Sequence, residues 1–206
     1  MERNEAVYSY ELNGSSTGRY VTLEEVQEEE KWDYITIQQA SRDVGWLDAY
    51  EPFLGIILDW IKEKVPAAKL YIHETWAYEI GHTDPCFMRY NREQQCMYDR
   101  LHYCYTTMAE KHGLGLIPSG TIIQKIRGID PFCVTKGGRS LCRDGYHMSL
   151  DYGRFLLACI WLKTITGISL KDVEYIPDAP ELTEAPDRNL LDFLKSYVDQ
   201  YEGYIK

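Results

Sequence analysis

The stretch Leu141–Ser149 combines an acid, a glycine and a histidine at a spacing that could support proton transfer. Asp144 stands three residues before His147, with Gly145 directly after the acid. A carboxylate hydrogen-bonded to an imidazole fixes its tautomer and stabilises its protonated form, which is the support that a general base needs. The same spacing also fits a plain turn, in which the aspartate caps local amides and the histidine faces solvent. Both interpretations are open on this stretch alone.

A helix is predicted directly after this stretch. Ser149 is of a type that accepts hydrogen bonds from the first amides of a helix, so we expect it to be the N-cap of residues 150–166. Gly167 is typical of the residue that ends a helix. Asp144 and His147 are therefore expected on a tight loop that leads into this helix, where both side chains can face one pocket.

The composition restricts the kind of protein that this can be. The 206 residues carry a formal net charge of −10, which argues against nucleic acid and against an anionic membrane as partners. No apolar run reaches membrane-spanning length, and we expect no signal peptide after Met1. The six cysteines lack C-x-x-C spacing, so reduced thiols are expected rather than disulfides or a zinc site. The expectation is a cytoplasmic protein without a metal or another cofactor.

Strand and helix patterns alternate along the chain. Runs at residues 33–39, 69–73 and 114–118 predict strands, and apolar residues at helical spacing predict helices between them. Such alternation predicts an α/β fold with a parallel sheet and helices on both faces. We expect a single domain over residues 1–206, with an N-terminal hairpin at 1–22 and a C-terminal connector and helix at 178–206.

Local signals place several boundaries of these elements. Asn13–Gly14 is typical of a hairpin turn, and Thr22 with Glu25 fits a capping box. The predicted helices begin near Phe53 and Asn91, and the first of them ends before Pro66. The sequence from Ser119 to Arg143 is expected to be a loop. Apolar residues predicted to lie on helices are Phe53, Ile56, Ile57, Trp60, Ile61, Met97, Leu101, Cys104, Met108, Leu190, Leu191, Leu194, Tyr197 and Val198.

Polar clusters follow the predicted strands at the point where each strand ends. Ligands in parallel α/β sheets bind at the carboxyl ends of the strands, so this coincidence favours a catalytic pocket over a plain turn. The residues expected to line that pocket beside Asp144 and His147 are Gln38, Gln39, Ser41, His73, Thr75, Trp76 and Ser119.

Four motifs occur in order along the chain. They are W-D-Y-I-T-x-Q-Q-A-S from Trp32, T-W-A-Y from Thr75, I-P-S-G from Ile117 and R-D-G-Y-H-x-S from Arg143. With these motifs, residues 8–167 resemble the SGNH (GDSL-like) hydrolase superfamily, in a bacterial branch. The resemblance implies a three-layer α/β/α, flavodoxin-like fold and hydrolysis of carbohydrate or small-molecule esters. It also implies that His147 is the general base, that Asp144 orients it, and that Gln39, or otherwise Gln38, is an oxyanion-hole amide.

The chain departs from the superfamily at its N-terminal blocks. A first strand ending in a nucleophilic G-N-S or G-D-S motif is absent, and so is the glycine block after it. Ser15 and Ser16 follow a hairpin strand, whereas Ser41 and Ser119 follow predicted sheet strands, and none of the four fits the nucleophile position. The chain alone is therefore expected to be inactive or impaired as an esterase. The missing strand normally pairs beside residues 34–38, so we expect the hairpin or a second copy of the chain, in a homodimer, to cover that edge.

Other functions stay open on the sequence. His73, Glu74, His82 and Asp84 could be metal ligands, although their spacing is not that of a zinc site. Arg127 and Arg143 could bind a substrate carboxylate, or they could pair with the many acids. A non-catalytic relative that binds a glycan or takes part in assembly is the alternative to an esterase. An upstream strand ending in Gly-Asn-Ser would favour the esterase, and a true translation start at Met1 would favour the alternative.

Overall fold

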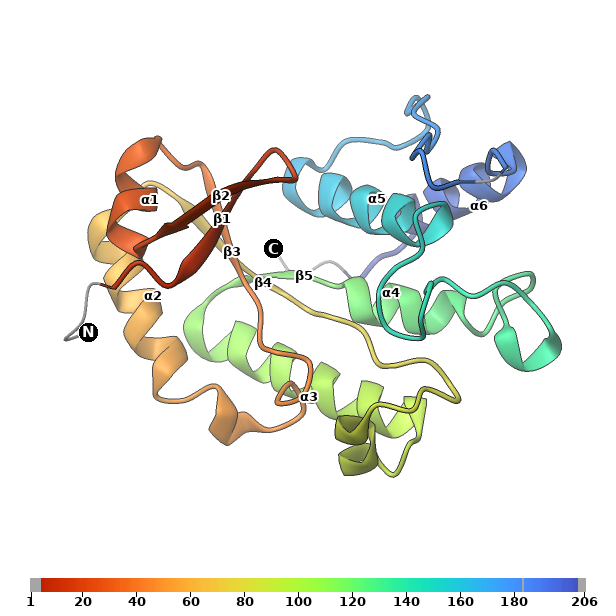
Figure 1. Cartoon of the computed structure of the whole chain (residues 1–206), viewed down its shortest axis with the longest axis horizontal. Helices are drawn as coiled ribbons and strands as arrows, with labels where there is room; N and C mark the ends of the chain where they lie inside the picture. The colour runs from red at the N-terminus through yellow and green to blue at the C-terminus, as the bar shows by residue number, and fades with distance from the viewer. Residues whose placement is uncertain (1–4, 183, 204–206) are drawn as a thin grey trace. The chain divides into compact units, whose positions relative to one another are not determined.

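The computed structural model describes residues 5–182 and 184–203 of the chain (Figure 1). These residues fall into two compact units. Of the described residues, the first unit contains 5–35 and 52–70, and the second contains 36–51, 71–182 and 184–203. Every residue predicted to line the catalytic pocket belongs to the second unit.

The first unit contains the predicted hairpin and two helices. β1 (Tyr8–Leu12) and β2 (Ser15–Val21) pair antiparallel. Asn13 and Gly14 form the turn between them, with φ angles of 53° and 76°, the left-handed values that a two-residue hairpin turn requires. Thr22 and Glu25 cap α1 (Leu23–Glu29) reciprocally, which confirms the predicted capping box. α2 (Phe53–Lys64) ends just before Pro66, as predicted, although the side chain of Phe53 is 72% exposed.

A three-stranded sheet contains the strands predicted from the sequence. Its strands are β3 (Tyr34–Ile37), β4 (Lys69–His73) and β5 (Gly115–Ile117), in the order β3-β4-β5. β4 and β5 are parallel, with Tyr71 opposite Gly115 and His73 opposite Ile117. The predicted α/β fold with a parallel sheet is therefore confirmed. The hairpin forms a separate two-stranded sheet, so it does not extend the sheet at β3 by backbone pairing, and a homodimer at that edge stays a prediction.

The helices of the second unit are α3 (Gln94–His112), α4 (Ser119–Ile126), α5 (Tyr152–Thr166) and α6 (Arg188–Asp199). Short 3₁₀ turns occupy Leu47–Ala49, Pro85–Tyr90 and Val134–Lys136. α3 and α5 both pack against β5, on opposite sides of that strand (Figure 1). The part of the chain that the structure describes has no helix long and apolar enough to cross a membrane.

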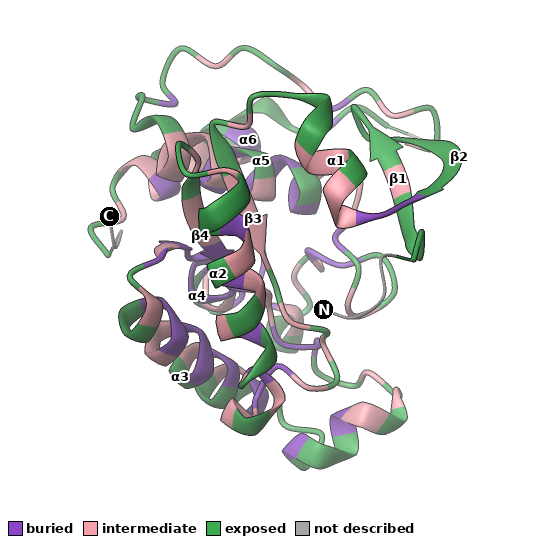
Figure 2. Cartoon of the chain, turned by 90° about the vertical axis from the view of Figure 1, so that its left-hand side faces the viewer, coloured by how far each residue is buried: buried purple, intermediate pink, exposed green. Residues whose placement is uncertain are grey.

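Burial explains how the helices of the second unit are placed. Met97, Leu101, Cys104 and Met108 are buried along one face of α3, as predicted, and Figure 2 shows this face. Ile117 of β5 belongs to a large apolar cluster with residues of α4, α5 and α6. α6 contributes Leu191, Leu194 and Val198 to that cluster, while Leu190 and Tyr197 are only partly buried against it.

Two local predictions were wrong. Residues 119–126 form helix α4 rather than a loop, because their isoleucines at helical spacing bury one apolar face. The N-cap of α5 is Asp151, not Ser149, since the Asp151 side chain accepts from the Tyr152 amide. Ser149 nevertheless accepts from the Gly153 amide at 3.0 Å, so it still satisfies one free amide of that helix. Gly167 ends α5 with a φ of 72°, as predicted.

Candidate functional site

The loop that contains Asp144 and His147 is closed by backbone pairing at its base. Cys142 and Met148 form an antiparallel bridge, and the Arg143 amide donates to the His147 carbonyl at 2.9 Å. Gly145 has a φ of 90°, a conformation that side-chain-bearing residues rarely adopt. The resulting turn brings the acid and the histidine onto the same side of the loop.

Asp144 and His147 make the hydrogen bond expected from their spacing. Asp144 Oδ2 and His147 Nδ1 lie 2.6 Å apart, while Asp144 Oδ1 accepts from the backbone amides of Tyr146 and His147. Desolvation raises the pKa of Asp144, but the hydrogen bonds from the His147 ring and the two amides outweigh it and hold that pKa well below its usual value. An ionised carboxylate only accepts hydrogen bonds, so the proton between the two side chains belongs to Nδ1.

The protonation of Nδ1 leaves Nε2 as the proton acceptor of the His147 ring. With Nδ1 protonated in the neutral ring, Nε2 presents its lone pair, which is the atom that a general base uses. The side chain of His147 is 48% exposed, and no protein atom of the described chain hydrogen-bonds to Nε2. The pair can therefore take a proton from a water molecule or from a hydroxyl group that approaches the loop.

Aromatic side chains surround this loop. The Trp76 indole donates to the Tyr146 carbonyl at 2.6 Å, and the ring of Tyr146 lies 3.8 Å from that of His147, measured between centroids. Tyr78 is 5.5 Å from Tyr146 by the same measure, and its hydroxyl is 3.0 Å from Ser41 Oγ. Trp76 thus contacts the Asp144–His147 loop directly. Ser41 is connected to the loop by way of Tyr78.

Three other predicted residues, Gln38, His73 and Ser119, form a separate series of hydrogen bonds. His73 Nδ1 lies 2.9 Å from Gln38 Oε1, and His73 Nε2 lies 2.9 Å from Ser119 Oγ. The Trp161 indole, which is only a donor, also points at His73 Nε2, at 3.3 Å. His73 Nε2 must therefore accept, and its Nδ1 donates to Gln38.

This hydrogen-bonded series has the order of a hydroxyl, an imidazole and an orienting group, but the hydroxyl and the imidazole are buried. Ser119 is 0% exposed, and burial lowers the pKa of His73 to about 4. An imidazole that acts as a base becomes positively charged when it takes a proton. The group bonded to the other nitrogen of His73 is the neutral amide of Gln38, so no carboxylate stabilises that charge. The ends of β3, β4 and β5 bring Gln38, His73 and Ser119 together, with His73 and Ser119 buried and Gln38 exposed.

Gln39 and Thr75 lie around the buried hydroxyl of Tyr105. The Gln39 amide and Thr75 Oγ1 are 3.3 Å and 3.2 Å from that hydroxyl. The side-chain NH₂ of Gln39 donates to the Ala49 carbonyl, and its oxygen accepts from the Ala40 amide. The Ala49 carbonyl thus uses one of the two side-chain N–H groups of Gln39. An oxyanion-hole role for Gln39 stays a prediction.

The possible metal ligands do not form a cluster. His73 bonds to Gln38 and Ser119, whereas the Glu74 carboxylate bonds to His102 and Thr121. Asp84 caps the Cys86 amide. Among the described residues, no group of three or more His, Cys, Asp or Glu side chains could hold a metal ion. All six cysteines are free thiols.

Several residues at these sites were not predicted from the sequence. Trp161 and His102 approach from α5 and α3, far along the chain from the residues that they contact. Tyr78 and Tyr146 belong to the T-W-A-Y and R-D-G-Y-H-x-S motifs themselves, and their place in those motifs was the signal that could have indicated them. Arg143 is exposed, while Arg127 is buried beneath the loop.

Comparison with known proteins shows the family. The family described as "Domain of unknown function (DUF4886)" matches residues 1–187. The crystal structure of a DUF4886 family protein from Bacteroides uniformis is similar at 31% identity and a TM-score of 0.80, over 95% of this chain and 73% of that one. A catalytic mutant of an acetylxylan esterase from Geobacillus stearothermophilus is similar at 19% identity and a TM-score of 0.45, over 70% of this chain and 71% of that one. Among curated proteins, none matches the sequence. The chain belongs to the DUF4886 family.

Proposed function

We propose that the second unit carries an ester-hydrolase site in which His147 is the general base and Asp144 orients it. The observation that carries the proposal is the 2.6 Å hydrogen bond between the two side chains, on an exposed loop that leaves His147 Nε2 accessible. The ordered motifs that resemble the SGNH (GDSL-like) hydrolases support the same chemistry. The proposed substrate is a carbohydrate ester or another small ester, since sugar rings stack on aromatic faces such as those of Trp76, Tyr78 and Tyr146.

The proposed reaction is base-assisted attack on the ester carbonyl. His147 Nε2 takes a proton from the attacking oxygen as its bond to the carbonyl carbon forms. The Asp144 carboxylate stabilises the imidazolium that results. The imidazolium then returns the proton to the leaving alkoxide, which departs as an alcohol. With water as the attacking group, ester and water become a carboxylic acid and an alcohol.

A serine positioned for covalent catalysis is not found beside His147 in the described residues. Ser41 is connected to the loop through Tyr78, and Ser119 is bonded to His73 instead. This observation favours a second candidate, a non-catalytic glycan-binding protein that keeps the aromatic side chains around the loop. It also predicts that any hydrolysis by this chain is slow, because water replaces an activated nucleophile.

The test is hydrolysis of 4-nitrophenyl acetate by the wild-type chain, His147→Ala and His102→Gln. His102 is a matched control, because it is a half-exposed histidine that also bonds to a carboxylate, that of Glu74. General base catalysis contributes about 10²–10⁴-fold to a rate. We expect His147→Ala to lose about 10²-fold in the protein-dependent rate, and His102→Gln to keep it.

Equal rates in the wild-type chain and His147→Ala would refute the hydrolase proposal. If that result came together with saturable binding of an acetylated xylo-oligosaccharide, it would support the binding protein instead. Circular dichroism of each variant shows whether a lost rate reflects lost folding.

A further inference from the structure

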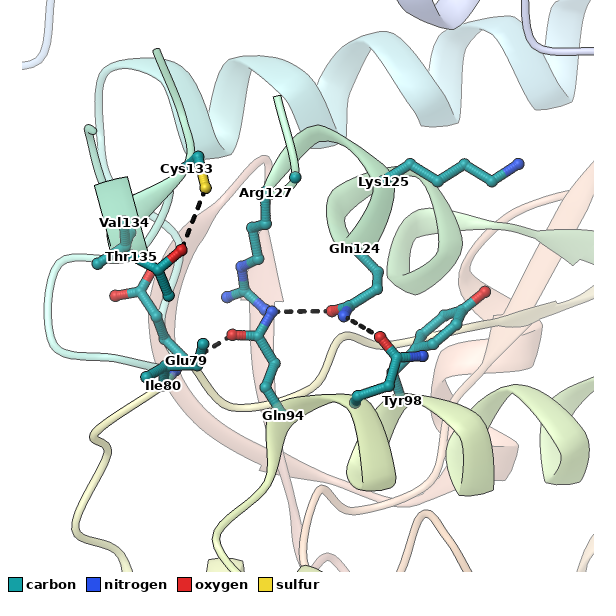
Figure 3. A pocket seen from close by; sticks show the side chains of 12 residues that line it. Glu79, Ile80, Gln94, Tyr98, Gln124, Lys125, Arg127, Cys133, Val134 and Thr135 are labelled. Carbon is teal, nitrogen blue, oxygen red and sulfur yellow. Dashed lines mark hydrogen bonds between the residues drawn. The ribbon is translucent and has the colours of Figure 1, made fainter. Parts of the chain in front are cut away.

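A hollow in the second unit has no part in the proposed reaction. It has a volume of about 460 Å³, within the range of about 300–1,000 Å³ typical of small-molecule sites. Figure 3 shows its lining, in which Arg127 and Gln124 of the α4 region face Gln94 of α3. Glu79, Tyr98, Lys125 and Thr135 also contribute.

Arg127 brings a positive charge to this pocket without a counter-ion. The residue is only 7% exposed, and its two hydrogen bonds go to the Ala77 carbonyl and to the sulfur of Cys142. Arg127 Nε is buried and has no partner, and no carboxylate of the described chain makes an ion pair with the guanidinium. Buried charges are normally paired, because desolvation of a lone ion is costly.

The carboxylate nearest in the lining is already engaged elsewhere. Both oxygens of Glu79 lie within hydrogen-bond distance of Ser140 Oγ, at 2.7 and 2.8 Å. Lys125 is the second cation of the lining, and its ammonium lies 4.8 Å from the centre of the Tyr201 ring. With one acid and two bases, the ionised side chains of the pocket carry a formal charge of +1.

The amide side chains of the pocket keep hydrogen-bonding capacity that the protein does not use. Gln94 Oε1 accepts from the Ile80 amide, and Gln94 Nε2 donates to Gln124 Oε1. Gln124 Nε2 in turn donates to Gln95 Oε1. Each of these amide nitrogens has two N–H groups and uses one here, so each can donate a further hydrogen bond to a ligand, and each amide oxygen that accepts one bond keeps a second lone pair.

We propose that this pocket binds a small organic carboxylate. A carboxylate is planar and accepts hydrogen bonds only, which matches a guanidinium flanked by free amide N–H groups. The inference is independent of the proposed hydrolase activity, because it concerns residues that the reaction does not use.

The test is a titration that compares D-glucuronate with D-glucose, which has a neutral hydroxymethyl group in place of the carboxylate. NMR signals of the Ile80 amide and of the arginine Nε–H groups report binding at the pocket. We expect saturable shifts with glucuronate, none with glucose at the same concentrations, and weaker binding in 500 mM than in 50 mM NaCl.

Gln124→Glu separates binding from folding. Residue 124 lies three positions before Arg127, so a carboxylate placed there can become the missing counter-ion. We expect this variant to lose at least tenfold in affinity for glucuronate while its Tm stays equal or rises. Gln200→Glu makes the same charge change on an exposed residue outside the pocket, and we expect it to bind as the wild-type chain does.

Three outcomes would overturn the proposal. They are an absence of saturable glucuronate binding, equal binding of glucose and glucuronate, and unchanged binding in Gln124→Glu. Inorganic phosphate that produced the shifts where glucuronate did not would also contradict a site for a carboxylate.

Discussion

His73 Nε2 lies 2.9 Å from Ser119 Oγ, so the pair that has a hydroxyl group is buried, whereas the pair that has a carboxylate is exposed. Asp144 and His147 have the charge and the access that a base requires, but no serine hydroxyl of the described chain bonds to His147. A histidine bonded to a hydroxyl group and a histidine bonded to a carboxylate thus occur at different places in one unit. This separation makes the roles of the two histidines distinguishable by experiment.

Ser119→Ala should lower stability without affecting hydrolysis. The substitution removes one hydrogen bond to His73, although the Trp161 indole still donates to the same nitrogen. The expected loss is about 1 kcal/mol in the free energy of unfolding, the usual contribution of one hydrogen bond. Urea denaturation measures it. A variant of normal stability that had lost its activity towards 4-nitrophenyl acetate would instead identify Ser119 as a nucleophile.

His73 should make stability depend on pH. Its pKa is lowered from 6.5 to about 4 by burial, so between these values the unfolded chain binds more protons than the folded one. Stability is therefore full above pH 6.5 and falls by about 3 kcal/mol as the pH drops towards 4. Urea denaturation at several pH values measures the slope, which should be shallower in His73→Gln.

His102 provides a control, because its pKa is shifted in the opposite direction to that of His73. The hydrogen bond that His102 donates to the Glu74 carboxylate raises the pKa of His102, so its contribution to stability is present below the ordinary pKa and is lost as the pH rises through the folded value. His102→Gln should therefore leave the acid-side loss of stability in place. The same acid-side slope in His73→Gln and the wild-type chain would contradict the assignment to His73.

The fold and the exposed pair could be predicted because their signals are local. β4 matches the predicted strand 69–73, and the hydrogen bond between Asp144 and His147 follows from a spacing of three residues across a glycine. α4 was missed because its eight residues begin with Ser119 and Gly120, which are typical of a loop. Gly120 is nevertheless required at the start of α4. A Cβ at this position would lie 2.1 Å from the Thr75 carbonyl oxygen, so only glycine lets the two backbones approach so closely.

The partners of the polar residues could not be predicted, because they come from distant elements. Ser119, Gln38 and His73 were all expected at strand ends, but whether they face solvent depends on Trp161, which α5 places over the ring. The side chain of Gln39 donates to the Ala49 carbonyl, in a short 3₁₀ turn. The sequence pattern did not predict this turn or the position of its carbonyl groups. Periodicity indicates which face of an element is buried, but it does not indicate which side chains meet there.

Asp144→Asn should impair hydrolysis more than folding. Asparagine keeps an oxygen for the amides of Tyr146 and His147, but its NH₂ group would donate to Nδ1 and shift the ring proton to Nε2. His147 could then no longer act as a base through that atom. We expect at least a tenfold loss of the protein-dependent rate, since the equivalent change in a complete triad costs about 10⁴-fold. A rate equal to that of the wild-type chain would show that Asp144 only caps the loop.

Gly145→Ala should distort the Asp144–His147 loop, and Gly137→Ala is its matched control. Both glycines have positive φ angles, of 90° and 81°, so alanine at either position costs about 1–2 kcal/mol of backbone strain. At Gly145 a Cβ would also lie 2.7 Å from His82 Nδ1, whereas at Gly137 nothing lies within 4 Å. The alanine at 145 must therefore displace His82, whose ring lies 5.2 Å from that of Tyr146 between centroids.

The two variants should differ in both stability and rate. Denaturation midpoints should fall for each, and further for Gly145→Ala, because only this variant adds a steric contact to the strain. Hydrolysis of 4-nitrophenyl acetate should fall in Gly145→Ala alone, since the displaced ring adjoins Tyr146 and through it His147. Equal losses of stability in both variants, with unchanged hydrolysis, would show that the loop tolerates the added methyl group. The geometry of the Asp144–His147 pair would then not depend on the packing of His82.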